Sequence, residues 1–183
     1  MKLMLSAMES PLGELTLVTD TQNRVRALAF ADHRSRHHRN LLENYGPCLP
    51  APAPIAAALN SYFGGSLAAL DAIVTATEGT EFQRRVWAAL RSIPAGETTS
   101  YGELARTLGY LDPRMAIDVG AANGANPIAI IIPCHRVIAK NGDLKGYAWG
   151  LHRKRWLLAH EGARVRTALE EKNIPRTMSL PGF

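Results

Sequence analysis

The chain has 183 residues, of which 46% are hydrophobic and 20% are charged. This composition is typical of a globular protein with one or two small domains. Its most apolar stretch, Ile128 to Ile132, is far too short to cross a membrane, and the N-terminus has no signal-peptide core. We therefore expect a cytoplasmic protein, or a nuclear one where the cell has a nucleus. The two cysteines, Cys48 and Cys134, exclude a disulfide scaffold and a four-cysteine zinc module.

The formal net charge is +5 and the isoelectric point about 9.5. A basic surface favours polyanions such as DNA, but many proteins without a nucleic-acid partner are equally basic. Charge alone leaves these two interpretations even.

The first part of the chain, residues 1–76, is predicted to be a small domain of strands and a helix. Leu15 and Leu17 alternate with polar residues between two turn sequences, which indicates a strand. The expected elements are strands within residues 1–30, a helix over 55–63 after a proline-rich connector, and a further strand over 67–75.

A polar, basic stretch follows the first strands. His33 and His37 would share a helix face there, a spacing that a metal site can use. No cysteine or carboxylate pattern accompanies them, so we interpret the stretch as a solvated helix face. Cys48 is interpreted as a structural residue.

The second part, residues 77–165, is predicted to be mainly helical. Thr80 with Gln83 and Ser100 with Glu103 are capping-box patterns, each of which begins a helix. A third helix is expected to begin at Asp112-Pro113 and run to about Asn123. The second and third of these helices resemble a helix-turn-helix, although an ordinary helical hairpin is the commoner structure. The remaining expectations are a buried strand or extended run over 128–132, a tight turn at 141–142, a helix over 152–160 and a mobile tail over 166–183.

Cys134 is the candidate nucleophile, because it follows an apolar run and a proline and has His135 beside it. A thiolate is the reactive form, and a nearby imidazole can accept the thiol proton. Adjacent side chains of an extended strand point to opposite faces. The pair can therefore cooperate only if the backbone turns here or a water bridges them, and Pro133 makes a turn plausible. Glu161 is a candidate to orient His135, but from spacing alone a surface carboxylate is the favoured interpretation.

The sequence around Cys134, IIIPCHRV at 130–137, closely resembles the active-site signature of the methylated-DNA–protein-cysteine methyltransferases. The resemblance is strong over residues 80–163 and weaker in the N-terminal part. It implies an α+β fold, with a small N-terminal mixed sheet and helix domain followed by a mainly helical domain that carries a helix-turn-helix and the active-site cysteine. The other matching stretches are TEFQRRVW at 80–87, SYGELA at 100–105, GAANGANP at 120–127, NG at 141–142 and WLLAHEG at 156–162.

The resemblance also implies the activity. Cys134 would accept the alkyl group from the 6-oxygen of alkylated guanine, and from the 4-oxygen of alkylated thymine, in double-stranded DNA. The target base would be flipped out of the duplex. The resulting thioether would be permanent, so each molecule acts once, and the chemistry requires no metal or cofactor. We expect a monomer with no membrane partner.

Individual roles are implied in the same way. His135 would take the Cys134 proton through a water, with Glu161 orienting the imidazole. Asn126 would fix the junction between the third helix and the active-site segment, and Tyr101 would press on the target phosphate and donate a hydrogen bond to the departing guanine. Val137, Tyr147, Ala148 and Trp149 would line the guanine pocket, and Ala121, Ala122 and Asn123 would lie on the helix face in the DNA minor groove.

Two positions depart from the family pattern. Ile117 occupies the position where the family has an arginine that fills the gap left by the flipped base. Either Ile117 acts as an apolar wedge, or Arg114, one turn earlier, reaches the gap; we favour Arg114. Asp118 is expected to face away from the phosphates. Trp149 replaces a glycine of many relatives and would narrow the pocket, which predicts faster transfer of methyl than of benzyl, unless the indole packs on the surface and changes nothing.

Two other classes of function compete with alkyl transfer. A DNA-lesion binding module would hold alkylguanine without accepting the alkyl group; Cys134 argues against it, whereas the displaced arginine is compatible with it. A cysteine hydrolase would turn over repeatedly, but the sequence shows no oxyanion or leaving-group machinery.

Overall fold

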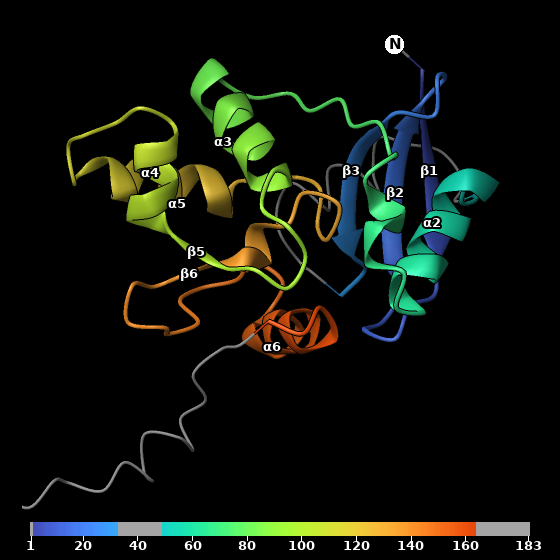
Figure 1. Ribbon diagram of the computed structural model, residues 1–183. Coiled ribbons are helices and arrows are strands. Elements are labelled where there is room, and N and C mark those ends of the chain that lie inside the picture. Colours follow the sequence, from blue (N-terminus) through green and yellow to red (C-terminus); the bar gives the residue numbers. More distant parts are fainter. Residues whose placement is uncertain (1, 33–48, 164–183) are drawn as a thin grey trace, which may run out of the picture.

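The structure is a computed structural model that describes residues 2–32 and 49–163 (Figure 1). His33, His37, Cys48 and the predicted mobile tail 166–183 lie outside the described residues. The helices α3, α4 and α5 gather at one end of the molecule, and the sheet with α2 lies at the other end. The molecule is thus a mixed α/β protein, as predicted.

A four-stranded mixed sheet forms the N-terminal end. Its strand order is β3-β2-β1-β4, with β1 (Leu3–Met8), β2 (Leu15–Asp20) and β3 (Val25–Phe30) antiparallel and β4 (Leu49–Pro50) parallel to β1. The strands predicted within residues 1–30 are therefore confirmed. Leu15 and Leu17 are fully buried, and all the remaining residues of β2 are buried as well. Both faces of this strand are therefore covered.

Helix α2 (Ala53–Phe63) buries Ile55, Leu59 and Tyr62, which recur at helical spacing. This confirms the predicted helix. The strand predicted over 67–75 is wrong: its first part is the short 3-10 helix η1 (Leu67–Leu70), and only Thr75 makes an isolated bridge to Val25. An apolar run of this length does not by itself distinguish a strand from a buried helical turn.

The C-terminal end contains α3 (Glu81–Arg91), α4 (Tyr101–Thr107) and α5 (Met115–Gly124). Both predicted capping boxes are present, at Thr80 before α3 and at Ser100 before α4. Helix α5 begins later than predicted. The Asp112 side chain accepts a hydrogen bond from the Arg114 backbone N–H. Asp112 therefore stabilises the turn that precedes α5 and is not the N-cap of the helix.

The segment 128–132 is buried as predicted, but it is neither the strand nor the extended run that was expected. Residues 129–131 form a turn, and Ile128 alone makes an isolated bridge to Leu28. Ile130 has a φ of 65°, which is rare for a β-branched residue and costs about 1–3 kcal/mol. This strained, buried turn leads into η2 (Cys134–Arg136) and β6 (Val137–Ile138), which pairs with β5 (Thr99–Ser100). The predicted turn at 141–142 is confirmed, because the Gly142 N–H bonds to the Ala139 carbonyl.

The last described helix, α6 (Leu151–His160), lies between the two ends of the molecule and confirms the helix predicted over 152–160 (Figure 1). One hydrophobic cluster joins Leu15, Leu28 and Tyr62 of the N-terminal part to Leu90 and Leu157 of the C-terminal part. The boundary near residue 76 stays a prediction, but the two parts share one core. Among the described residues, no helix is long and apolar enough to cross a membrane.

Candidate active site

Cys134 begins the 3-10 helix η2 and is only 2% exposed. Pro133 precedes it, and the backbone turns here instead of continuing as a strand. The turn required for Cys134 and His135 to cooperate is therefore present.

Asn126 organises the turn that leads to Cys134. Its Nδ2 donates to the carbonyls of Ile128 (3.1 Å) and Ile132 (2.8 Å) and lies 3.1 Å from the Cys134 Sγ, and its Oδ1 accepts from the Ile128 N–H. One buried amide thus joins the end of α5 to the nucleophile, where the sequence predicted such a link. Each of these bonds also stabilises the strained conformation of Ile130.

His135 and Glu161 form a buried pair. The His135 Nε2 lies 3.0 Å from the Glu161 Oε1, and both side chains are inaccessible to solvent. The Arg136 guanidinium donates two hydrogen bonds to the same carboxylate, from Nε to Oε2 (2.9 Å) and from Nη2 to Oε1 (2.8 Å). The Tyr62 hydroxyl also donates to Oε1 (2.7 Å). Glu161 is therefore no surface carboxylate, which corrects the interpretation that spacing alone favoured.

Burial is the largest single influence on the pKa of each of these groups, and it sets the direction of the shift for Cys134 and His135. It raises the pKa of the Cys134 thiol to about 11, so the free protein holds a thiol at neutral pH. Burial lowers the pKa of His135, which keeps the imidazole neutral. Burial by itself would raise the pKa of Glu161, but hydrogen bonds from His135 and Arg136 outweigh it and hold that pKa well below its usual range. A neutral imidazole that donates to an anionic carboxylate has its other nitrogen free to accept a proton.

That other nitrogen, the His135 Nδ1, is buried and has no hydrogen-bond partner among residues 2–32 and 49–163. The group is thus a candidate general base for the neighbouring thiol.

Lys154 is a buried cation close to the site. It is fully inaccessible, and its Nζ donates to the carbonyls of Val137 (2.8 Å), Lys145 (2.9 Å) and Gly146 (3.4 Å). No carboxylate of the described residues pairs with it. Burial lowers its pKa to about 8, and the interaction with Cys134 acts in the opposite direction. A lysine in this position stabilises a thiolate more than a thiol.

A cavity of about 400 Å³ opens beside Cys134. Tyr147, Ala148 and Trp149 line it, as predicted for a substrate pocket, whereas Val137 is fully buried, pairs with Thr99 and is not among the lining residues. The remaining lining residues are Tyr101, Gly120, Asn123, Gly124 and Gly146.

Trp149 is 5% exposed and belongs to the wall of this cavity, so the alternative in which it packs on the surface is wrong. Its ring meets the Tyr147 ring edge-on at 5.2 Å, and its carbonyl accepts a hydrogen bond from the Arg153 guanidinium (3.1 Å). Arg153 in turn donates to the Leu12 carbonyl and to Asp32, which fastens the cavity wall to the N-terminal part.

The predicted DNA-binding residues in and next to α5 differ in their exposure to solvent. Ile117 is 75% exposed, and Arg114 and Ala121 are exposed, but Ala122 is 3% exposed and its carbonyl accepts from the Trp87 indole N–H. The Ala122 side chain lines a cavity together with Phe82 and Gln83 of α3, which argues against its predicted place in a DNA groove. Asn123 is buried and lines the Cys134 cavity.

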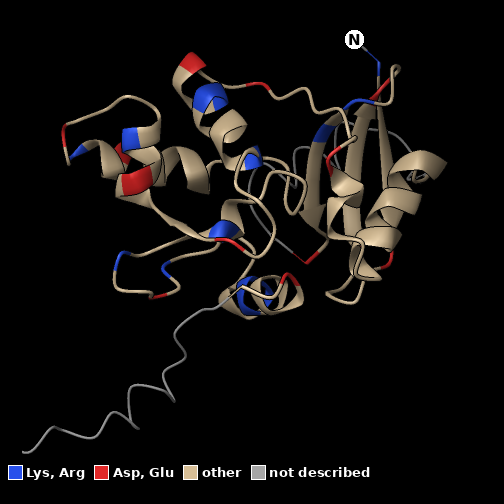
Figure 2. Ribbon diagram, viewed as in Figure 1, with Lys and Arg blue, Asp and Glu red and all other residues tan. Residues whose placement is uncertain are grey.

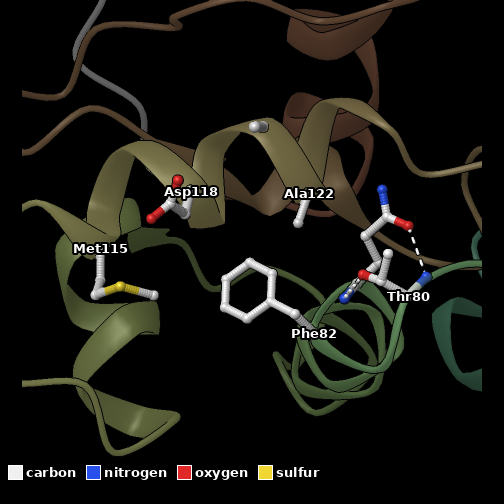
Figure 3. A pocket seen from close by; sticks show the side chains of 7 residues that line it. Thr80, Phe82, Met115, Asp118 and Ala122 are labelled. Atoms are coloured by element: carbon white, nitrogen blue, oxygen red, sulfur yellow. Dashed lines mark hydrogen bonds between the residues drawn. The ribbon is translucent and has the colours of Figure 1, made fainter.

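A second cavity of about 330 Å³ lies between α3 and α5. Figure 3 shows the Phe82 ring facing α5 between Met115 and Ala122, with Asp118 at the rim. Gly120, Asn123 and Gly124 face the Cys134 cavity from the opposite side of α5, as helical periodicity requires.

Sequence reasoning missed three residues of this site. Arg136 belongs to the motif at 130–137 but was given no role. Its position next to His135 was the signal that could have identified it. Tyr62 and Lys154 carried no local signal, because their partners are brought close only by the fold.

Comparison with known proteins identifies the family. A family model described as "6-O-methylguanine DNA methyltransferase, DNA binding domain" matches residues 81–163. The methylated-DNA–protein-cysteine methyltransferase of Salmonella typhimurium is 48% identical over 170 residues, which cover 88% of this chain and 97% of that protein. The corresponding protein of Mycobacterium bovis is 44% identical over 162 residues, which cover 86% and 91%.

Solved structures agree. The crystal structure of Mycobacterium tuberculosis O6-methylguanine methyltransferase has a TM-score of 0.76 at 39% identity and covers 94% of this chain and 100% of that one. The crystal structure of Mycobacterium tuberculosis OGT in complex with DNA has a TM-score of 0.71 at 41% identity and covers 86% and 92%. The chain belongs to the methylated-DNA–protein-cysteine methyltransferase family.

Proposed function

We propose that this protein repairs alkylated DNA by transferring the alkyl group from the 6-oxygen of guanine, and from the 4-oxygen of thymine, to the Sγ of Cys134. The observation that carries the proposal is the buried Cys134 at a cavity, backed by a neutral His135 whose Nδ1 is unpartnered among the described residues. Membership of the family supplies the reaction class.

In the transfer step, the bond from Sγ to the alkyl carbon forms as the bond from that carbon to the guanine 6-oxygen breaks. The electron pair of the broken bond goes to guanine, and the thiol proton goes through a water to the Nδ1 of His135, which Glu161 then stabilises as imidazolium. Burial, and then Cys134, raise the pKa of Tyr101, so its hydroxyl keeps its proton and can donate a hydrogen bond to the departing guanine. Cys134 ends as a thioether, and each molecule reacts once.

Helices α4 and α5 would act as the helix-turn-helix that carries the flipped base to the cavity. Tyr101 begins α4 and its ring lies against Gly120 of α5, where an added Cβ would be 3.7 Å away. Ile117 precedes Gly120 by about one turn of α5 and is highly exposed.

The Arg114 guanidinium, by contrast, is held by Asp112 (Nη2 to Oδ2 3.0 Å) at the beginning of α5. Figure 2 likewise shows acidic as well as basic residues on the helical end, rather than one basic stripe. These observations support Ile117, not Arg114, as the side chain that fills the gap in the duplex, by the apolar insertion that other minor-groove proteins use. We further propose that the protein acts as a monomer in the cytoplasm and needs no metal or cofactor.

The test is the intact mass of the protein after mixing with a duplex that carries one 6-O-methylguanine. A gain of one methylene, located on Cys134 by peptide mapping and lost in Cys134→Ala, is expected. Selective binding of the lesion without a gain in mass would instead identify a lesion-binding module. Repeated turnover without a lasting adduct would identify a hydrolase.

A further inference from the structure

Tyr62 reaches the active site from the N-terminal part of the chain. It lies on α2, is fully buried, and its hydroxyl donates a 2.7 Å hydrogen bond to the Glu161 Oε1, across 99 residues of sequence. No step of the transfer described above uses it.

The Oε1 that Tyr62 contacts is the oxygen that holds His135. It accepts from Tyr62 (2.7 Å), Arg136 Nη2 (2.8 Å) and His135 Nε2 (3.0 Å), whereas Oε2 accepts only from Arg136 Nε (2.9 Å) among the described residues. The shortest of the three contacts at Oε1 is the one from Tyr62. Donors that share one acceptor oxygen compete, so the tyrosine hydroxyl weakens the hold of Glu161 on His135.

Resting on the alkyl transfer proposed above, we propose that Tyr62 is a positioning residue that limits how strongly Glu161 stabilises the protonated form of His135. Helix α2 thereby helps to set the pH range in which the C-terminal site reacts. The N-terminal part is then a component of the proton relay as well as a packing partner.

The direction of the effect follows from the charges. A hydroxyl that donates to a carboxylate spreads its negative charge and reduces its attraction for a neighbouring cation. Without that hydroxyl, Glu161 attracts the imidazolium more strongly and the pKa of His135 rises. Other ionisable groups around the pair are Arg136 on η2, Cys134 beside it, Lys154 and His160 on α6, and Tyr147, whose ring meets His135 edge-on at 6.5 Å.

Tyr62→Phe removes this hydrogen bond with little else. The ring meets His160 edge-on at 5.2 Å, and the His160 Nε2 bonds to the backbone carbonyl of Tyr62 (2.7 Å), contacts that phenylalanine retains. Glu161 keeps its two bonds from Arg136. A folded variant with an altered relay is therefore expected.

The first measurement is the single-turnover rate of methyl transfer against pH, at saturating methylated duplex. In Tyr62→Phe the acid limb should move to higher pH by about half a unit to one unit, the size of the net contribution of one ordinary hydrogen bond. Tyr110→Phe is the matched control. Its hydroxyl accepts from Arg85 instead, and its profile should follow the wild type.

The second measurement is the pKa of His135 from the imidazole NMR signals of DNA-free Cys134→Ser protein, with the resonance assigned by His135→Gln. The same upward shift should appear when Tyr62→Phe is added and not when Tyr110→Phe is added. Unchanged pKa values and an unmoved acid limb would overturn the role of Tyr62. This titration needs no alkyl transfer, so it separates that failure from a wild-type protein that gains no methylene.

Discussion

Helix α5 separates two cavities of similar size, about 400 Å³ beside Cys134 and about 330 Å³ beside Phe82. Both are lined by side chains of α5 and of a neighbouring element. Behind the first lies a set of buried polar groups whose hydrogen bonds converge on Asn126, His135 and Glu161. The second is lined by Thr80 and Gln83, whose side chains form the capping box of α3 (Figure 3).

This difference shows that the volume of a cavity does not by itself identify an active site. The Cys134 cavity differs in the buried groups that surround it without lining it: Lys154, Arg136 and Tyr62 form hydrogen bonds in the core behind it. Such buried groups cost stability unless they are fully paired, and here the hydrogen bonds to carbonyls and to one carboxylate provide that pairing.

The largest effect should come from Lys154→Met. It leaves three carbonyls without their donor and removes the cation near Cys134, so we expect methyl transfer to slow about tenfold or more and unfolding to become easier by about 2–4 kcal/mol. Rapid-quench rates and urea unfolding measure the two effects. Lys145→Met, which changes an exposed lysine beside the same loop, is the control and should match the wild type.

The pH dependence of stability sharpens this prediction. The pKa of Lys154 is about 8 in the folded protein against 10.5 in an unfolded chain, so the folded state binds fewer protons between these values. Stability contributed by Lys154 therefore rises with pH across that window. The difference in unfolding free energy between wild type and Lys154→Met should grow from pH 8 to pH 10.5, and a constant difference would contradict the assignment.

The next largest effect concerns Ile117, an exposed residue of α5. Ile117→Ser should slow transfer from a duplex about tenfold, because a polar side chain fills the gap in the base stack poorly, while transfer from single-stranded DNA should change little. Comparison of the two substrates isolates the contribution to base flipping. If Arg114→Ala has the larger duplex-specific effect, the arginine fills the gap.

A smaller effect is expected at the cavity wall. Wild-type protein should transfer methyl faster than benzyl, because the buried Trp149 ring narrows the pocket, and Trp149→Ala should raise the benzyl-to-methyl ratio about threefold to tenfold. Paired rates on matched oligonucleotides give the ratio, and thermal melting checks the fold. Equal wild-type rates for the two groups would refute the steric argument.

The smallest effect belongs to the second cavity. Asp118→Asn removes an exposed negative charge from α5, which should tighten DNA binding less than about tenfold and make its dependence on salt only slightly steeper. The rate of transfer from bound DNA should stay at the wild-type value, as followed in a single-turnover assay. A loss of transfer would mean that both sides of α5 take part in the reaction, and the comparison of the cavities would fail.

Local patterns determined much of the fold. The alternation around Leu15 predicted β2, and the pairs Thr80–Gln83 and Ser100–Glu103 marked the beginnings of α3 and α4, because capping boxes involve residues only three positions apart. The apolar run at 128–132 misled, since burial favours Ile and Val in any conformation. In the structure the segment is a turn with its own backbone hydrogen bonds, and Asn126 donates to two of its carbonyls.

The sequence by itself determined the family and pointed to Cys134 as the candidate nucleophile, since the motif around Cys134 is contiguous. The tertiary structure alone decided the surroundings of that cysteine: Glu161 accepts hydrogen bonds from Tyr62 and Arg136, and Lys154 is buried against three carbonyls. The physical reason is the distance along the sequence over which each interaction acts. Propensity and capping act between near neighbours, whereas a pKa is set by burial and by charges that meet only when distant segments pack together.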